Sequence, residues 1–557
     1  MIPKSLKGFN YFDGDTLLQD FLAETIPDSF NNYKTKLSLF GEWVGSEVEE
    51  SADYSNRYAP PVLQPYNKDG EKTNNIIFNP LYEKTHKEAY KKGVIGLAFK
   101  KNPEPHLLSF VMGYLLSHAD ISIHCPVTMT GAVAYVLKTI APAQLRDEFL
   151  PLLTKMDGTA LSGGTWATEL HGGSDVGATT TIATKDGSTY KLSGLKWFTS
   201  NANSGIAVAT ARANQDIKGS KGLGLYLVPS HLENGKPNNY HIRRLKEKIG
   251  TKGLATGEID LENTLAYEIV PPPMGLKAMM EALEYSRIHN TMSATGTHRR
   301  AFLEALSWTE HRTAFGEKII NYPMVQDEIL KVLFFLEASF ALSAEAALNF
   351  DKTLKYPENK PWLRLVTGLA KYQTAEWAAQ AVKDTTEIIG GNAYTDEFPM
   401  ARIMKDVYSL LLWEGPANIQ AIEVARMCTG KNKIGYNIYK NKIQELTIDS
   451  EKLWPGEFTI IRDNLSVIEQ LVSAMQKDTK NISLYARKAM VTMSETLAMA
   501  LLCKKAACKK NKNNDFRYFL VAKGLVNLLH QEKKPGTETV MHKHFFELLN
   551  YKPVNTL

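Results

Sequence analysis

A loop with two adjacent glycines offers groups that could bind a phosphate. It runs from Ala167 to Val176 and contains Gly172, Gly173 and Ser174. Glycine lets a ligand approach the backbone closely, and exposed N–H groups beside a serine hydroxyl suit a phosphate or pyrophosphate. A tight turn without a ligand is the alternative, and for this loop taken alone it is the simpler explanation.

A second segment places an aromatic ring and a hydroxyl two residues apart. It runs from Gly194 to Asn201 and includes Phe198 and Ser200. On a strand these two side chains face the same side, so the ring could stack on a flat ligand while the hydroxyl bonds its edge. Taken alone, the same pattern is more typical of an ordinary β core.

The third segment holds an acid among apolar residues. Glu414 follows Leu411, Leu412 and Trp413 and precedes a Gly-Pro break. Apolar surroundings disfavour the charged carboxylate and raise its pKa, which suits a general base. A glutamate that caps the next helix, stabilised by the helix dipole, explains the residue equally well.

Helices and strands must position these groups, and the N-terminal part of the chain is predicted to be helical. Up to about residue 155, apolar residues recur three and four apart, as in 105–118 and 131–140. The stretch 56–79, rich in Pro, Asn and Tyr, is expected to be an irregular linker.

From about Gly158 to Ile269 the apolar period changes to two. Turn residues at Asp186-Gly187, Asn234-Gly235 and 250–253 separate short runs of β-forming residues. The pattern predicts a compact β domain with strands near 179–184, 189–192, 206–211 and 223–228.

Long helical periodicity resumes after Pro271-Pro272-Pro273. It predicts bundle helices over 281–313, 324–347, 361–388 and 405–427. A further helical segment carries the stripe Leu465, Ile468, Leu471, Val472 and Met475. The expected domains are residues 1–157 (helical, with long loops), 158–272 (β), 273–430 (four-helix bundle) and 431–557 (basic helical extension).

Composition excludes several classes of protein. The 557 residues are 44% apolar and 22% charged, as in ordinary globular chains. No apolar run approaches the roughly 20 residues of a membrane span, and residues 1–13 lack the core of a secretory signal, so we expect a cytoplasmic protein. Four cysteines (Cys125, Cys428, Cys503 and Cys508) lack zinc-site spacing and are expected to be buried free thiols; no metal site is expected.

Charge is distributed unevenly. The net charge is +5, yet residues 431–557 hold 21 Lys and Arg against 12 Asp and Glu, which leaves −4 for the rest. The basic excess therefore lies in the extension.

The three chemical segments, in their order, resemble the flavin-dependent acyl-CoA dehydrogenase family. Its motifs have the forms Thr-Glu-x-x-x-Gly-Ser-Asp, Gly-x-Lys-x-x-x-x-Asn and Tyr/Trp-Glu-Gly. The likeness covers about residues 85–430 and includes 312–316 and 387–392, which look like the family's contacts to the adenine and pyrophosphate of a neighbouring subunit's flavin. Residues 125–130, 196–200 and 413–415 are most similar to the AidB branch of alkylation-response relatives, which also carries a helical extension.

This resemblance implies an α+β fold with an N-terminal helical domain, a middle β-barrel or sandwich, a C-terminal four-helix bundle and an extra helical domain. It implies FAD, with Phe198 stacked on the ring, Ser200 and Thr168 at its edge and Ser174 on the pyrophosphate. By position, the cofactor-binding residues are Ala167, Thr168, Gly173, Ser174, Phe198, Thr199, Ser200, Arg312, Phe315, Glu387, Gly390, Gly391, Asn392, Pro416 and Asn418.

The resemblance also implies the reaction. Glu414 would remove an α-proton from a fatty acyl-CoA while the β-hydride passes to flavin N5, and Ser174, Glu284 and Arg287 would bind substrate. One branch of the family keeps its base on the first bundle helix, where this chain has Ser286, so Glu414 is the remaining candidate. A homo-oligomer, by analogy a tetramer, and an electron-transfer flavoprotein as acceptor are implied as partners.

Three positions depart from the family. Glu387 replaces a Gln, Ala314 replaces a Thr, and Pro416 replaces a Thr and so lacks both an N–H and a hydroxyl for the cofactor. These losses weaken, without abolishing, the expectation of tight FAD binding.

The extension supports an alternative function. Lys504, Lys505, Lys509, Lys510 and Lys512 cluster in it, and AidB-like proteins are associated with duplex DNA. The chain could be a flavoprotein that mainly binds duplex DNA through 431–557 or sequesters fatty acyl groups, with weak turnover. A solvated lysine face is the simpler explanation of the cluster, and dehydrogenation is the favoured function.

Overall fold

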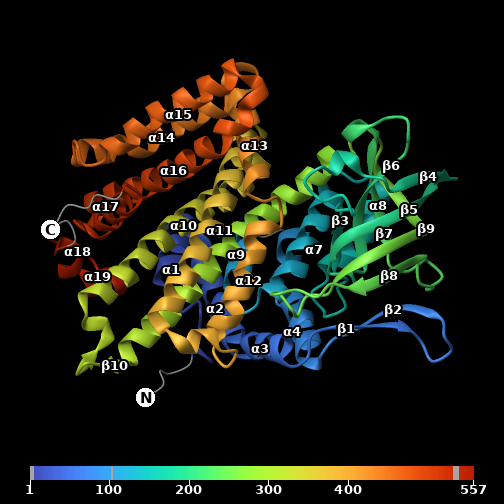
Figure 1. Ribbon diagram of the computed structural model, residues 1–557, viewed down its shortest axis with the longest axis horizontal. Helices are drawn as coiled ribbons and strands as arrows, with labels where there is room; N and C mark the ends of the chain where they lie inside the picture. Colours follow the sequence, from blue (N-terminus) through green and yellow to red (C-terminus); the bar gives the residue numbers. More distant parts are fainter. Residues whose placement is uncertain (1–5, 102–104, 531–538) are drawn as a thin grey trace. The chain divides into compact units, whose positions relative to one another are not determined.

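The computed structural model describes residues 6–101, 105–530 and 539–557 and separates into two compact units (Figure 1). One unit comprises Ser46–His289; the other combines Met1–Gly45 with Asn290–Leu557.

Helices dominate the first part of the unit Ser46–His289, as the apolar spacing predicts. They are α3 (Glu49–Arg57), α4 (Pro80–Lys91), α5 (Gly96–Phe99), α6 (His106–Leu116), α7 (Ile121–Thr139) and α8 (Ala143–Thr154). Every residue of α6 is buried. The unbroken apolar character of this helix therefore reflects a core position rather than a surface one.

The expected irregular linker at 56–79 is wrong in part. Residues 62–77 form an antiparallel hairpin of β1 (Val62–Tyr66) and β2 (Lys72–Ile77) (Figure 1). The side chains of the hairpin alternate between the two faces. Ile76 is buried in the β core and Leu63 packs against that core, while their neighbours Val62 and Ile77 are exposed.

Seven strands form the β domain of this unit. They are β3 (Gly163–Trp166), β4 (Ile182–Asp186), β5 (Thr189–Ser200), β6 (Ile206–Arg212), β7 (Leu223–Pro229), β8 (Tyr240–Leu245) and β9 (Thr256–Val270). Neighbours follow the order β3-β6-β4-β5-β9-β7, β8 pairs with β9, and an additional β6–β7 pairing closes the sheet on itself. The closed ring of β6, β4, β5, β9 and β7 encloses a core that includes Trp166, Leu192, Val228 and Ile259, while β3 and β8 lie at its sides, paired with β6 and β9.

The second unit holds the bundle helices. It contains α1 (Thr16–Thr25), α2 (Pro27–Trp43), the part of α9 (Gly275–His311) from Asn290 on, the short pair β10 (Thr313–Ala314) and β11 (Glu317–Lys318), α10 (Pro323–Lys355), α11 (Lys360–Ile389), α12 (Pro399–Leu412) and α13 (Ala417–Thr429). The block expected as one helix over 405–427 is two helices. Gly415 with positive φ and Pro416 separate them.

The extension packs tightly within the same unit. It contains α14 (Ile434–Leu453), α15 (Thr459–Lys477), α16 (Ile482–Asn513), α17 (Arg517–His530), α18 (Thr539–Lys543) and α19 (Phe545–Leu549). Helix α16 contacts α14, α15 and α17 and also the bundle helices α10, α11 and α13, and Figure 1 shows α14 and α15 alongside it. The extension is thus part of the bundle's core.

The cysteine expectation is confirmed at three positions. Cys125, Cys428 and Cys503 are buried free thiols, but Cys508 is free and exposed. It lies near the C-terminal end of α16. Within 6–101, 105–530 and 539–557, no helix is both long and apolar enough to cross a bilayer.

Candidate functional site

The glycine loop of the β domain is pinned at its base by a buried carboxylate. Glu169 accepts hydrogen bonds from the N–H and hydroxyl groups of Thr180 and Thr181, at distances of 2.6 to 3.1 Å. Lys196, on β5, donates to the same carboxylate at 2.8 Å, and both side chains are buried. Glu169 therefore ties the first part of the loop to Thr180 and Thr181, which follow the loop, and to β5.

Electrostatics favour the ionised form of Glu169. Burial opposes the charge of Glu169, but Lys196 and the threonine hydrogen bonds outweigh it and lower the pKa of Glu169 to about 2. Burial also lowers the pKa of Lys196, and Glu169 partly offsets that effect. A buried pair satisfied by this many bonds is rigid, which suits a frame around a ligand loop.

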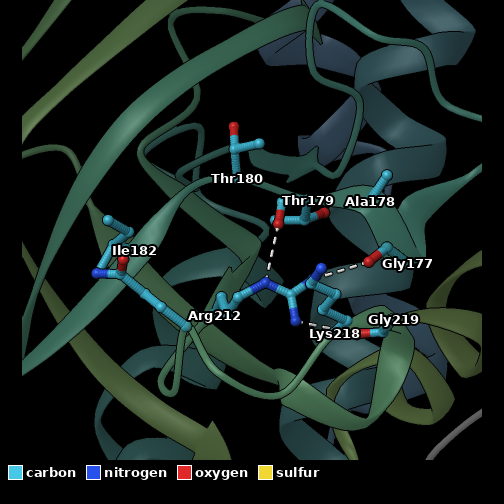
Figure 2. A pocket seen from close by; sticks show the side chains of 9 residues that line it. Gly177, Ala178, Thr179, Thr180, Ile182, Arg212, Lys218 and Gly219 are labelled. Atoms are coloured by element: carbon cyan, nitrogen blue, oxygen red, sulfur yellow. Dashed lines mark hydrogen bonds between the residues drawn. The ribbon is translucent and has the colours of Figure 1, made fainter.

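Arg212 ties the other side of the loop to a neighbouring turn. Its guanidinium donates to the carbonyls of Thr179 (3.1 Å), Gly177 (2.7 Å) and Gly219 (3.1 Å), and also to that of Ile217. Figure 2 shows Arg212 among the residues that line an open pocket of about 380 Å³. Since backbone carbonyls occupy most of its donors, Arg212 serves to fix the loop.

Within the loop, Ser174 is exposed. A Cβ at Gly173 would lie 2.6 Å from Thr168 Oγ1, so only glycine lets the loop pass this close to Thr168. Ala167 and Thr168 are half-buried, and the Thr168 carbonyl accepts the Trp197 N–H at 2.9 Å. That bond links the loop directly to β5.

The aromatic and hydroxyl residues of β5 lie as the alternation predicts. Phe198 is 50% exposed and Ser200 is half-buried, whereas Thr199 is buried and donates its hydroxyl to the Gly257 carbonyl at 2.7 Å. Thr199 can therefore offer a ligand only its backbone. Lys246 Nζ lies 4.8 Å from the Phe198 ring centroid, a cation–π contact, and also pairs with the Glu258 carboxylate at 2.7 Å.

The predicted substrate residues on α9 are buried in this unit. Glu284 is 9% exposed and Arg287 is 6% exposed. Between them, Ser286 is buried and donates its hydroxyl to the Ala282 carbonyl at 3.1 Å.

Most of the predicted flavin contacts in the other unit are exposed. Arg312 precedes the β10–β11 turn, at whose tip Phe315 is 98% exposed with φ +53°. At the end of α11, Glu387 is exposed and pairs with Lys383 at 2.8 Å. Gly390 has φ +80°, and neither it nor Gly391 has any atom within 4 Å of an added Cβ, so this backbone is open to a ligand next to Asn392.

Glu414 lies in the turn between α12 and α13, in the same unit. Its φ is +59°, a left-handed value that costs a non-glycine residue about 1–2 kcal/mol, and Gly415 follows with φ +96°. Gln420 Nε2 donates to the carbonyls of Glu414 and Gly415, both at 3.1 Å. Lys371 Nζ, from α11, donates to the carbonyls of Leu411 (3.2 Å) and Gly415 (2.9 Å).

Two further predicted residues flank this turn. Pro416 is the N-cap of α13, and Asn418 is exposed in the first turn of that helix.

Sequence reasoning assigned no role to Lys371, Gln420 or Arg212. Arg212 is the last residue of the buried strand β6, and Lys371 interrupts an apolar stretch of α11. A charge in such a place signals a buried partner. The sequence alone does not say which partner.

Three family domains match consecutive parts of the chain. They are the "Adaptive response protein AidB N-terminal domain" over residues 2–157, the "Acyl-CoA dehydrogenase, middle domain" over 164–264 and the "Acyl-CoA dehydrogenase, C-terminal domain" over 274–428. The chain belongs to the acyl-CoA dehydrogenase family and is an AidB-like member of it.

Two similar proteins are also named as acyl-CoA dehydrogenases. "Acyl-CoA dehydrogenase family member 11" of Caenorhabditis elegans is 27% identical, over 88% of this chain and 84% of that protein. "Putative acyl-CoA dehydrogenase AidB" of Escherichia coli is 27% identical, over 70% and 73%.

Solved structures share the fold. C. elegans ACDH-11 matches with a TM-score of 0.87 and 24% identity, covering 99% of this chain and 96% of that one. The apo form of Bd2924 matches with a TM-score of 0.82 and 27% identity, covering 90% and 99%. The α+β fold class, with a β-rich middle domain and a helical remainder, is confirmed.

Family members are flavoproteins, which implies FAD, and the residues present fit such a group. The half-exposed Phe198 ring and the exposed Ser174 hydroxyl beside Gly173 offer stacking and phosphate contacts in one unit. The open backbone at Gly390 and Gly391 and the exposed Arg312 offer phosphate contacts in the other.

Proposed function

We propose that this protein catalyses the α,β-dehydrogenation of a fatty acyl-CoA with Glu414 as the base. The Glu414 carboxylate takes the α-proton, the β-carbon gives up a hydride, and the electron pair of the broken α C–H bond forms the new double bond. When bound, FAD supplies the two-electron acceptor for that hydride. An electron-transfer flavoprotein then serves as the proposed acceptor of the electrons.

The conformation of Glu414 carries this proposal. A glutamate held at φ +59° between two helices is strained, and strain of this kind persists where the surrounding structure over-determines it, often at functional sites. Ser286, at the other position where the family keeps a base, has a hydroxyl bonded to the Ala282 carbonyl and no carboxylate. Glu414 is therefore the base we assign.

The remaining residues bind and orient. Phe198 stacks on the flavin ring, Ser174 binds the pyrophosphate, and Arg287 supports the acyl-CoA site. We further propose that the exposed Arg312 and Phe315, together with the open backbone at Gly390 and Gly391, reach the cofactor of a second copy of the chain in a homotetramer.

Anaerobic titration of the FAD-loaded protein with an acyl-CoA tests the reaction. The ACDH-11 structure was solved with C11-CoA, so an acyl-CoA of that length is the first substrate to use, followed by shorter and longer chains. We expect bleaching of the flavin absorbance. Glu414→Gln should lower the bleaching rate at least about 10³-fold, because the amide cannot accept the proton.

The matched control is Glu358→Gln, which removes an exposed acid between α10 and α11 and should bleach at the wild-type rate. If Glu414→Gln also bleaches at that rate, the assigned base is wrong. If the wild-type protein binds acyl-CoA without any bleaching, the acyl-sequestering alternative replaces dehydrogenation.

Duplex DNA binding stays a prediction of the extension. Three of its five clustered lysines make contacts inside the protein: Lys505 lies 4.4 Å from the Tyr518 ring, Lys509 pairs with Glu24, and Lys510 lies over Phe516. Lys504 and Lys512 are exposed. A salt titration of duplex binding by Lys504→Glu/Lys512→Glu tests the idea: unchanged affinity and salt dependence would remove this cluster as a DNA site.

A further inference from the structure

We infer that Lys371 is a positioning residue that holds the turn bearing Glu414 in its reactive conformation. This inference rests on the proposed role of Glu414 and adds a specific partner to it. Everything it uses lies in one unit, on α11, α12 and α13 and in the turn between α12 and α13.

Lys371 is almost fully buried, at 1% exposure. Its ammonium donates to the Leu411 carbonyl at 3.2 Å, before the turn, and to the Gly415 carbonyl at 2.9 Å, within it. One cation on a neighbouring helix thus bridges the two sides of Glu414.

These carbonyls need a donor. Leu411 is in the last turn of α12, where helix carbonyls lack partners within the helix and where the helix dipole favours a cation. Gly415 lies outside both helices, so its carbonyl depends on side chains. Lysine supplies several donors and a charge here, whereas an apolar residue would remove its bond to the Leu411 carbonyl and leave Gly415 with the Gln420 bond alone.

The backbone of the turn does not hold this shape unaided. Glu414 and Gly415 have φ of +59° and +96° in succession, and the first of these is unfavourable for a residue with a side chain. Gln420 adds two bonds to the carbonyls of Glu414 and Gly415 from the α13 side. Lys371 and Gln420 therefore secure the turn from opposite helices.

Holding a base in place affects the chemical step more than binding. A displacement of about 1 Å can cost on the order of 100-fold in rate. We therefore expect Lys371→Met, which keeps the length but loses the donors, to lower the rate of flavin reduction at saturating acyl-CoA by about 10- to 100-fold. The apparent Kd for acyl-CoA and the flavin absorbance spectrum should change little, and Lys371→Arg should recover most of the rate.

Amide hydrogen exchange of the flavin-free protein gives a readout independent of turnover. Peptides that span 411–418 should exchange faster in Lys371→Met than in wild type, while peptides from the β domain should not change. Arg364→Met, which removes an exposed cation from the same helix, is the matched control and should leave exchange and rate unaltered. Should Lys371→Met fail to fold, Gln420→Leu serves in its place and is expected to show the same two effects more weakly.

The outcomes separate this inference from the proposed reaction. Wild-type flavin reduction and unchanged exchange in Lys371→Met, together with an inactive Glu414→Gln, would overturn the inference alone. A loss in Lys371→Met that appears only in the Kd for acyl-CoA would also overturn it. An active Glu414→Gln would overturn the proposed function instead, whatever Lys371→Met does.

Discussion

At the residue scale, single side chains divide into those that face a ligand and those that hold the frame. On β5 the division follows the strand alternation: Phe198 faces outward and Thr199 bonds inward to Gly257. In the loop, exposed Ser174 lies between the anchor points of Glu169 and Arg212. Changes to outward residues should therefore affect ligands, and changes to anchors should affect the fold.

Phe198→Ala tests the outward class. Loss of a stacking ring should weaken FAD binding by about tenfold, with little change in thermal stability because the ring is half exposed. Titration of the flavin-free protein with FAD, followed by flavin fluorescence, measures this effect. Tyr66→Ala removes a similarly exposed ring from the same unit (53% against 50%) and should bind FAD normally; equal losses in both variants would contradict the stacking role.

Glu495, on α16, gives a pH prediction. Burial raises its pKa to about 7, so between about pH 4.5 and 7 the folded protein binds more protons than the unfolded chain, and stability falls as the pH rises through this window. Glu495→Gln removes the cost of the buried charge, on the order of 3 kcal/mol above pH 7 for a pKa raised from 4.5 to about 7. We expect a higher thermal midpoint than wild type at pH 8 and the same midpoint at pH 4.5. Glu445→Gln, at an exposed acid on α14, is the control; an equal gain at both pH values would refute the assignment.

At the element scale, buried ion pairs join helices that are distant in the sequence. Arg517 of α17 donates to both carboxylate oxygens of Glu337 on α10 and to the Leu548 carbonyl. Both side chains of the pair are about 1% exposed or less. A pair this deeply buried stabilises the fold mainly because, without its partner, either charge would be buried unpaired.

A double-mutant cycle tests this contribution. Arg517→Met should destabilise the protein by about 3–5 kcal/mol, because it leaves Glu337 charged and alone, and Glu337→Met should do the same to Arg517. The double variant should recover much of the loss, since two apolar side chains replace the pair. Chemical denaturation of the three variants and wild type gives the coupling energy. Additive losses would show that the two charges act independently.

At the scale of the whole molecule, the extension belongs to the unit that carries Glu414. Phe334 of α10 packs against Gly524 of α17 so closely that a Cβ there would lie 2.3 Å from the ring. Cys428 of α13 lies 4.0 Å from Met493 of α16. These contacts make the basic segment a structural part of the bundle as well as a charged surface.

Removal of residues 431–557 should therefore abolish soluble folded protein, because it exposes buried faces of α10, α11 and α13. The Lys504→Glu/Lys512→Glu variant, which changes charge alone, should keep the wild-type thermal midpoint. Yield in the soluble fraction and circular dichroism compare the two. A well-folded 1–430 fragment would show that the bundle does not depend on the extension.

Much of the fold could be predicted from local signals. The change of apolar period near Gly158 marks the β domain, and the expected helices over 324–347 and 361–388 lie inside α10 and α11. The hairpin at 62–77 was not predicted because packing on the β core stabilises it. The turn at Glu414 divides the block that the periodicity predicted as one helix. Among the site residues, motif order pointed to the loop, β5 and Glu414, but no local pattern pairs Lys371 with a turn some 40 residues later.

The sequence by itself determined the family, the order of α and β segments and the residue types that carry the chemistry, because these depend on spacing along the chain. Only the tertiary structure decided which charged side chains hold the backbone in place. Lys196 pairs with Glu169, Arg212 donates to four backbone carbonyls, and Lys371 donates to the turn that contains Glu414. It also turned most of the lysine cluster into internal contacts. Burial is the physical reason, since a charge taken out of water must find partners, and only the folded chain brings those partners within reach.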